Sequence, residues 1–93
     1  MTFELGFLPE ALKEWEKLDA CIREQFKNKL AESLTNPRVP SARLSGQKDR
    51  YKIKLRSAVF RLVYEVRDAQ LIVVIVAVGK PQRNAVYKVA AQR

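Results

Sequence analysis

The most informative absence in this sequence of 93 residues is that of histidine. Without it the chain lacks the side chain that most often serves as a general acid or base near neutral pH, and it cannot form a Ser-His-Asp triad. The single cysteine, Cys21, excludes an internal disulfide and a cysteine-based zinc site. A glycine-rich phosphate-binding loop is missing as well. The side chains left for catalysis are those of lysine, arginine and tyrosine.

Long hydrophobic runs and carboxylate clusters are also missing. No apolar run approaches the roughly 20 residues of a membrane span, and the longest, residues 71–78, suits a buried strand. The N-terminus lacks the basic-then-apolar plan of a signal peptide, so we expect a cytoplasmic protein with no membrane partner. Asp49, Glu65 and Asp68 are scattered through the second half. We therefore expect neither a bound metal nor another cofactor.

What the chain has in excess is positive charge. The length predicts a single domain over residues 1–93, and 47% hydrophobic with 30% charged residues is typical of a soluble globular protein. The net charge is +8. Residues 1–36 hold five of the 18 basic and seven of the ten acidic residues, so the rest of the chain carries a balance of +10. Such polarity predicts a basic face that binds nucleic acid, and an acidic protein would be attracted to the same face.

The pattern of apolar residues predicts an α+β fold. Strands are expected at about 3–7, 50–56, 60–66 and 71–78, by alternation or by continuous apolar character. Two amphipathic helices should begin at Pro9 and after a capping Asp19, the second ending at Asn36-Pro37. They form a two-helix hairpin packed on a mostly antiparallel sheet of about four strands, and a short C-terminal helix follows Asn84.

The helices also carry specific expectations. Their apolar stripes are Leu8, Ala11, Leu12, Trp15 and Leu18 in the first helix, and Ile22, Phe26, Leu30 and Leu34 in the second. Spacing on the first helix predicts that Glu14 pairs with Lys17 on the solvent side.

Around the segment Tyr51-Lys52-Ile53-Lys54-Leu55-Arg56, apolar and basic residues alternate. On a strand, Tyr51, Ile53 and Leu55 would face the core, and Lys52, Lys54 and Arg56 would share the other face. If the next strand returns as a hairpin, Arg61 joins this basic row. The preceding loop, 37–50, adds Arg43 and Arg50, and Leu44 should pin it to the core. A solvated strand face shows the same alternation, so the pattern alone leaves both interpretations open.

A row of fixed cations is what RNA cleavage by its own 2′-hydroxyl requires. The hydroxyl must lose a proton, attack the adjacent phosphorus and expel the 5′-oxygen through a dianionic phosphate, which lysine and arginine can stabilise. A lysine acts as a base only when its amine is deprotonated. Nearby cations favour the deprotonated form. Binding of nucleic acid without cleavage would use the same charges.

Several motifs also match a known family. They are Ala11-Leu12-Lys13-Glu14-Trp15 with Lys17-Leu18, Arg23-Glu24-Gln25, Leu44 with Gly46, residues 51–57, Arg61-Leu62-Val63-Tyr64, Val78-Gly79-Lys80 and Val86-Tyr87. The chain thereby resembles RelE, the messenger-RNA-cleaving toxin family of bacterial toxin–antitoxin pairs, almost from end to end. The resemblance implies a small α+β domain that enters the ribosomal A site and cuts the bound codon.

By that resemblance, Lys52 and Lys54 fall on the two strand lysines of the family, with Lys54 as general base. Arg61 would stabilise the phosphate in the transition state, and Tyr87 would orient or stack on the substrate nucleotide. Further RNA contacts are expected from four other basic residues of this half, namely Arg43, Arg50, Arg56 and Lys80.

One position departs from the family pattern. The arginine that follows the Gly-Lys pair, the family's acid or phosphate ligand, is Pro81 here. Arg83 matches another basic position of the family and is our candidate to replace it, with Lys80 as a further candidate.

The resemblance also implies partners. They are a RelB-type antitoxin, the bacterial ribosome with its mRNA and rRNA, and operator DNA reached only through the antitoxin complex. Two alternatives stay open: a toxin of the same superfamily with another target, such as DNA gyrase in the ParE branch, and a non-catalytic basic RNA-binding protein.

Overall fold

Four strands form one mixed sheet in the computed structural model, which describes residues 3–44, 49–55, 60–79 and 85–93. The elements in chain order are β1 Glu4–Phe7, α1 Pro9–Glu16, α2 Ala20–Thr35, η1 Pro40–Ala42, β2 Arg50–Lys54, β3 Arg61–Arg67, η2 Asp68–Gln70, β4 Ile72–Gly79 and α3 Ala85–Gln92. The strand order is β1-β4-β3-β2, in which β2, β3 and β4 are antiparallel and β1 runs parallel to β4. The predicted α+β class and mostly antiparallel sheet are confirmed, whereas the sequence pattern does not predict the parallel pairing.

The two N-terminal helices begin and end close to the predicted residues. Pro9 is the first residue of α1, where its missing N–H removes no helical hydrogen bond. Asp19 precedes α2 with an extended backbone, but its side chain makes no capping hydrogen bond, so the capping prediction holds for position only. The last N–H at Asn36 donates to Glu32, and Pro37 follows, so α2 stops where the pattern predicts.

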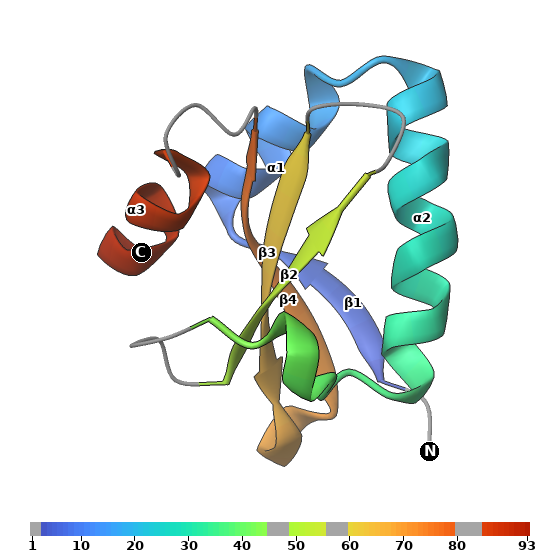
Figure 1. Ribbon diagram of the computed structural model, residues 1–93, viewed down its shortest axis with the longest axis vertical. Helices are drawn as coiled ribbons and strands as arrows, with labels where there is room; N and C mark the ends of the chain where they lie inside the picture. The colour runs from blue at the N-terminus through green and yellow to red at the C-terminus, as the bar shows by residue number, and fades with distance from the viewer. Residues whose placement is uncertain (1–2, 45–48, 56–59, 80–84) are drawn as a thin grey trace.

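This helical hairpin covers one face of the sheet, which we call the helical face (Figure 1). Its core contains Trp15, Phe26 and Leu30 from the helices, all buried. The predicted inward residues of β2 and its C-terminal flank are buried in the same layer, namely Tyr51, Ile53 and Leu55. Trp15 packs against Phe7 and Phe26, with ring centroids 5.4 and 6.1 Å away. The prediction for Leu12 is wrong: the residue is 42% exposed, because only part of the apolar stripe of α1 reaches the sheet.

The opposite face, which we call the α3 face, is covered in part by α3 (Figure 1). A second buried cluster fills this layer, made of Leu44, Val63, Val76, Ala77, Val86 and Ala90. Leu44 thus pins the loop before β2, as predicted. Residues 73–78 are all buried, because β4 lies inside the sheet and is covered on both faces.

Ion pairs hold the loop that leads from α2 to β2. The Arg38 guanidinium lies 2.7 Å from the carboxylate of Asp68, at the turn between β3 and β4, and 3.5 Å from that of Asp49. The buried Tyr64 hydroxyl donates to the carbonyl of Pro37 at 2.6 Å. The loop is therefore fixed to the sheet beside β2. None of the helices in the described part of the chain is long and apolar enough to cross a membrane.

Candidate active site

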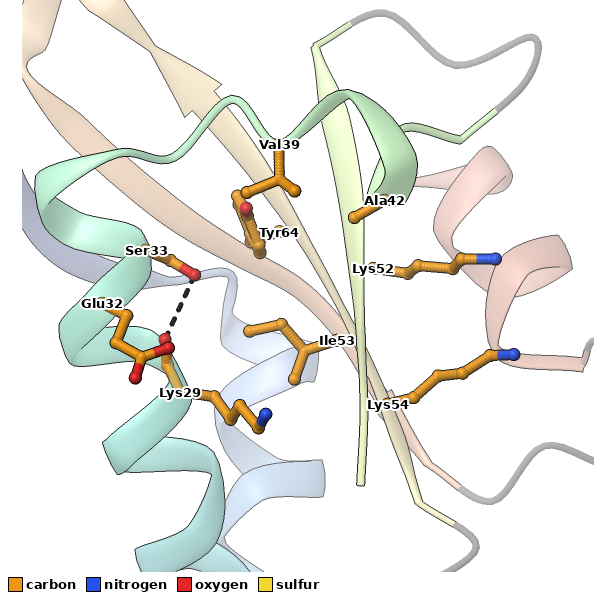
Figure 2. Close-up of a pocket in the computed structure, with 9 residues that line it drawn as sticks. All are labelled: Lys29, Glu32, Ser33, Val39, Ala42, Lys52, Ile53, Lys54 and Tyr64. Atoms are coloured by element: carbon orange, nitrogen blue, oxygen red, sulfur yellow. Dashed lines mark hydrogen bonds between the residues drawn. The ribbon is translucent and has the colours of Figure 1, made fainter. Parts of the chain in front are cut away.

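The basic row of β2 lies on the α3 face. Figure 2 shows the ammonium groups of Lys52 and Lys54 extending in the same direction, away from Ile53, which points to the opposite side of the strand. The register of β2 with β3 sets Lys54 directly opposite Arg61, and Lys52 opposite Val63. Directly opposite residues of an antiparallel pair point to the same face, with Cβ atoms about 5 Å apart. The prediction that Arg61 shares the face of the two lysines is confirmed.

Arg61 is a partly enclosed cation of this row. Its side chain is half-buried, and Nε is buried with no hydrogen-bond partner within the described part of the chain. A buried donor without a partner is destabilising, and its presence despite this cost to folding is compatible with a functional role. Beside it, Lys54 is exposed and Lys52 is half-buried. The arrangement therefore offers an anion one enclosed guanidinium and, next to it, an accessible amine.

The far side of Arg61 is bounded by the end of β4. Arg61 pairs with Gly79, the last residue of that strand. A Cβ atom at Gly79 would lie 3.0 Å from Cγ2 of Val86 in α3, so the absence of a side chain lets α3 approach the strand closely. The first turn of α3 thus lies against the strand end that neighbours Arg61.

A groove of about 200 Å³ lies next to this basic row, between α2 and β2 (Figure 2). Lys52 and Lys54 contribute to its lining, but their ammonium groups point away from it in the figure. Lys29 and Ser33 of α2 line the other side. The groove therefore belongs to the helical side of β2, and the catalytic candidates face away from it.

Arg50 begins β2 on the same face, and its side chain is engaged within the fold. It lies 3.2 Å from the carboxylate of Glu65 and donates a short hydrogen bond to the carbonyl of Ala90 in α3. Only 14% of the side chain is exposed. Its contacts tie β2 to β3 and to α3, and RNA binding by Arg50 stays a prediction. Arg43 is exposed and bridges to Tyr51 of β2, so it borders the basic row.

Glu65 confines the positive charge to one end of the α3 face. Its partial burial acts to raise the carboxyl pKa, but hydrogen bonds from Arg67 and Arg50 outweigh this and leave the pKa below its ordinary value. The ionised carboxylate thus neutralises charge at the Arg50 end of β2. At the other end, where Lys54 lies opposite Arg61, no ion pair with a carboxylate is found among the described residues.

Part of the predicted site lies outside the described residues: Arg56, Lys80, Pro81, Arg83 and the capping Asn84. Tyr87 lies in α3, and its side chain is likewise outside the description. Among the described residues there is no group of three histidine, cysteine or carboxylate side chains that could hold a metal.

Glu14 and Arg93 are two residues near the site whose role the sequence pattern missed. Glu14 was expected to pair with Lys17 on the solvent side, and this is wrong: its carboxylate accepts hydrogen bonds from Arg93 and from the backbone N–H of Val78. These partners lie 79 and 64 residues away in the sequence. Helical spacing reports only near neighbours, so it gives no signal for such contacts.

Comparison with known proteins identifies the family. The family model described as the ParE toxin of the type II toxin–antitoxin system parDE matches residues 5–85. The chain is 48% identical over 93 residues to the mRNA interferase toxin RelE of Escherichia coli K12, covering 100% of this chain and 98% of the relative. This chain belongs to the RelE-type toxins of the RelE/ParE superfamily. A RelE-like toxin protein of Escherichia coli is 54% identical over the same coverage.

Solved structures agree with this membership of the RelE-type toxins. A mutant of the E. coli toxin RelE in the free state superimposes with a TM-score of 0.93 at 47% identity, covering 100% of this chain and 98% of that one. The toxin in the intact E. coli RelBE toxin–antitoxin complex gives a TM-score of 0.83 at 49% identity, covering 87% and 99%.

Proposed function

We propose that this RelE-type toxin is an endoribonuclease that cuts messenger RNA in the ribosomal A site and so inhibits translation. The observation that carries the proposal is the pair formed by Lys54 and Arg61, an accessible amine directly opposite an arginine whose buried Nε has no partner in the described part of the chain. The mRNA interferase names of relatives that span the whole chain support it.

In the proposed reaction, a deprotonated Lys54 accepts the proton of the 2′-hydroxyl. The freed oxygen attacks the adjacent phosphorus, and the bond to the 5′-oxygen breaks. The products are a 2′,3′-cyclic phosphate and a 5′-hydroxyl end. Arg61 and Lys52 stabilise the dianionic phosphate in between, where fixed cations in a partly enclosed site act strongly. No step requires a metal.

Tyr87 and Arg83 complete the proposed site by resemblance to the family. Tyr87 orients the nucleotide, and Arg83 takes the role of the family arginine as acid or phosphate ligand, since Pro81 has neither charge nor donor. Arg83→Ala should then lower the cleavage rate by several orders of magnitude with ribosome binding nearly unchanged, and Pro81→Arg should raise it little. A parent-like rate in Arg83→Ala, or a large gain from Pro81→Arg, would contradict this assignment.

The ribosome is proposed as part of the working enzyme. With no histidine to serve as acid and base, much of the rate must come from holding the codon in line for attack. Naked RNA should therefore be cut poorly, and message bound in the A site well. With this substrate, the toxin is proposed to act in the cytoplasm.

A RelB-type antitoxin is the proposed inhibitor. The RelBE complexes among similar solved structures support this partner. The balance of +10 in residues 37–93 would attract an acidic partner segment. Operator DNA is proposed as a target only of the toxin–antitoxin complex, through the antitoxin.

The deciding experiment compares parent, Lys54→Ala and Lys13→Ala toxins on ribosomes programmed with a defined A-site codon. Lys13 is an exposed lysine of α1, outside the proposed site. Parent and Lys13→Ala should cut the message, while Lys54→Ala should lose 100-fold or more, about the effect of a general base. Inhibition of DNA gyrase without message cleavage would instead support the ParE-type alternative, and RNA binding without cleavage the non-catalytic one.

A further inference from the structure

The C-terminal half of β4 has no β1 neighbour, and its pairing with β3 leaves out one residue. On one side, β1 ends where Phe7 pairs with Ile75, and the N–H of Leu8 makes the last hydrogen bond, 3.0 Å, to the Ile75 carbonyl. On the other side, the register with β3 shifts, so that Val76 is skipped. Val76 and Val78 are both buried. Buried backbone groups need partners, so any group of Val76 or Val78 that β3 leaves without a partner must be satisfied by other means.

An ion pair between two helices supplies those partners. One guanidinium nitrogen of Arg93, which follows α3, donates to the Val76 carbonyl at 2.9 Å and to Glu14 of α1 at 2.8 Å. The second nitrogen donates to the other carboxylate oxygen of Glu14 at 3.3 Å. The N–H of Val78 donates to Glu14 at 3.2 Å. Glu14 and Arg93 thus form a two-pronged pair that joins α1, β4 and α3.

The same pair fixes one end of the helix that borders the active site. At the other end of α3, Val86 packs against Gly79, which neighbours Arg61 in the sheet. Tyr87 follows Val86 directly. The position of the first turn of α3 relative to Arg61 therefore depends on how firmly its last turn is held.

We propose that Glu14 and Arg93 are positioning residues for RNA cleavage, which hold α3, and with it Tyr87, in register with the Lys54–Arg61 end of the sheet. The inference rests on the proposed function. Neither residue touches the reacting atoms. Their effect arises from the placement of α3. It should change the cleavage rate of the bound complex, because misplacing a substrate-orienting group weakens binding of the transition state more than binding of the substrate.

The contacts of the pair distinguish this role from that of an ordinary surface ion pair. Only 19% of the Arg93 side chain and 31% of that of Glu14 are exposed, and each also binds the backbone of β4. The pair formed by Arg38 and Asp68 is a suitable comparison. Its two contacts between guanidinium and carboxylate also join distant parts of the chain, but both side chains are exposed. Arg38→Ala is therefore the control for the loss of an arginine–carboxylate pair.

The test compares Arg93→Ala, Arg93→Lys, Glu14→Gln and Arg38→Ala by two measurements. The first is cleavage of ribosome-bound message at saturating and half-saturating toxin. The second is amide hydrogen exchange of the free toxin, which requires no RNA. We expect Arg93→Ala to lower the saturated rate tenfold or more, with the half-saturating concentration within twofold of the parent, and to speed exchange in α3. Arg93→Lys and Glu14→Gln keep part of the network and should fall between it and the parent.

The outcomes distinguish failure of the positioning role from failure of the proposed function. Parent-like rates in Arg93→Ala and Glu14→Gln, or equal losses in Arg38→Ala, would overturn the positioning role. Faster exchange throughout the chain in both conservative variants, rather than in α3, would overturn it too. A parent toxin that cuts no message would refute the proposed function instead, and exchange in α3 would still show whether the pair holds the helix.

Discussion

Replacing Arg61 with methionine should move activity and stability in opposite directions. The Arg61→Met side chain keeps a long apolar stem but removes the guanidinium. In the parent, Nε is buried with no partner in the described part of the chain, and Lys54 is the residue directly opposite in the strand pairing. Both features oppose folding and, in our proposal, both serve the phosphate.

The size of the two effects can be set from these contacts. A buried donor without a partner costs about 1–3 kcal/mol, and like charges directly opposite on a sheet cost about 0.2–1 kcal/mol. The half-exposed side chain retains part of its hydration, so we expect the lower end, a gain of about 1 kcal/mol in the free energy of unfolding. For a domain of this size that raises Tm by roughly 4–8 °C. Loss of one fixed donor to the transition state should lower cleavage by about 10²–10³-fold.

The measurements are thermal unfolding and single-turnover cleavage of message on programmed ribosomes. Arg67→Met is the matched control, because Arg67 lies in the same strand and pairs with Glu65 at 2.6 Å. It should lower Tm slightly and leave cleavage unchanged. An Arg61→Met toxin that is less stable than the parent would refute the reading of the buried Nε, and one that cuts at the parent rate would remove Arg61 from the reaction.

Three further predictions concern stability and RNA binding. Tyr64→Phe removes the 2.6 Å hydrogen bond to the Pro37 carbonyl and should lower the free energy of unfolding in urea by about 1 kcal/mol without altering cleavage. Burial opposes ionisation of Glu65, but its two arginine partners lower its folded pKa. The stabilising contribution of Glu65 is therefore present above the ordinary pKa of 4.5 and is lost as pH falls through the folded pKa. Glu65→Gln should flatten this acid dependence of the free energy of unfolding in urea titrations. RNA binding should weaken steeply with salt, and Lys52→Ala should reduce that slope by about one charge, more than Lys13→Ala does; equal slopes would contradict a privileged α3 face.

The sequence predicts the basic row well because its information is local. Alternation along residues 51–56 fixes which side chains share a face, and the short connection to β3 brings Arg61 to that face. The continuous apolar run before Gly79 likewise predicts a strand covered on both sides, as observed for β4.

What the sequence does not predict is non-local. Alternation identifies a face but not a neighbour, so the parallel pairing of β1 with β4 has no signal in the pattern. An apolar stripe does not show how wide the buried contact is, so it gives no sign that Leu12 is exposed. The sequence pattern treats Arg50 as one more cation of the basic face, because it does not reveal the contacts with Glu65 and Ala90. The partners of Glu14 were hidden by the same limitation.

The parallel pairing of β1 with β4 bears on when the toxin can fold during its own synthesis. Glu4 pairs with Ile72, so the first strand cannot pair until the fourth has been synthesised, 68 residues later. Until then the apolar side of the helical hairpin has no completed sheet to cover it. Pairings this distant close late, because the entropy of the intervening loop must be overcome first. β3, which carries Arg61, depends on β4 for its inner neighbour. The proposed site at Lys54 and Arg61 therefore stays incomplete in a nascent chain until β4 has left the ribosome.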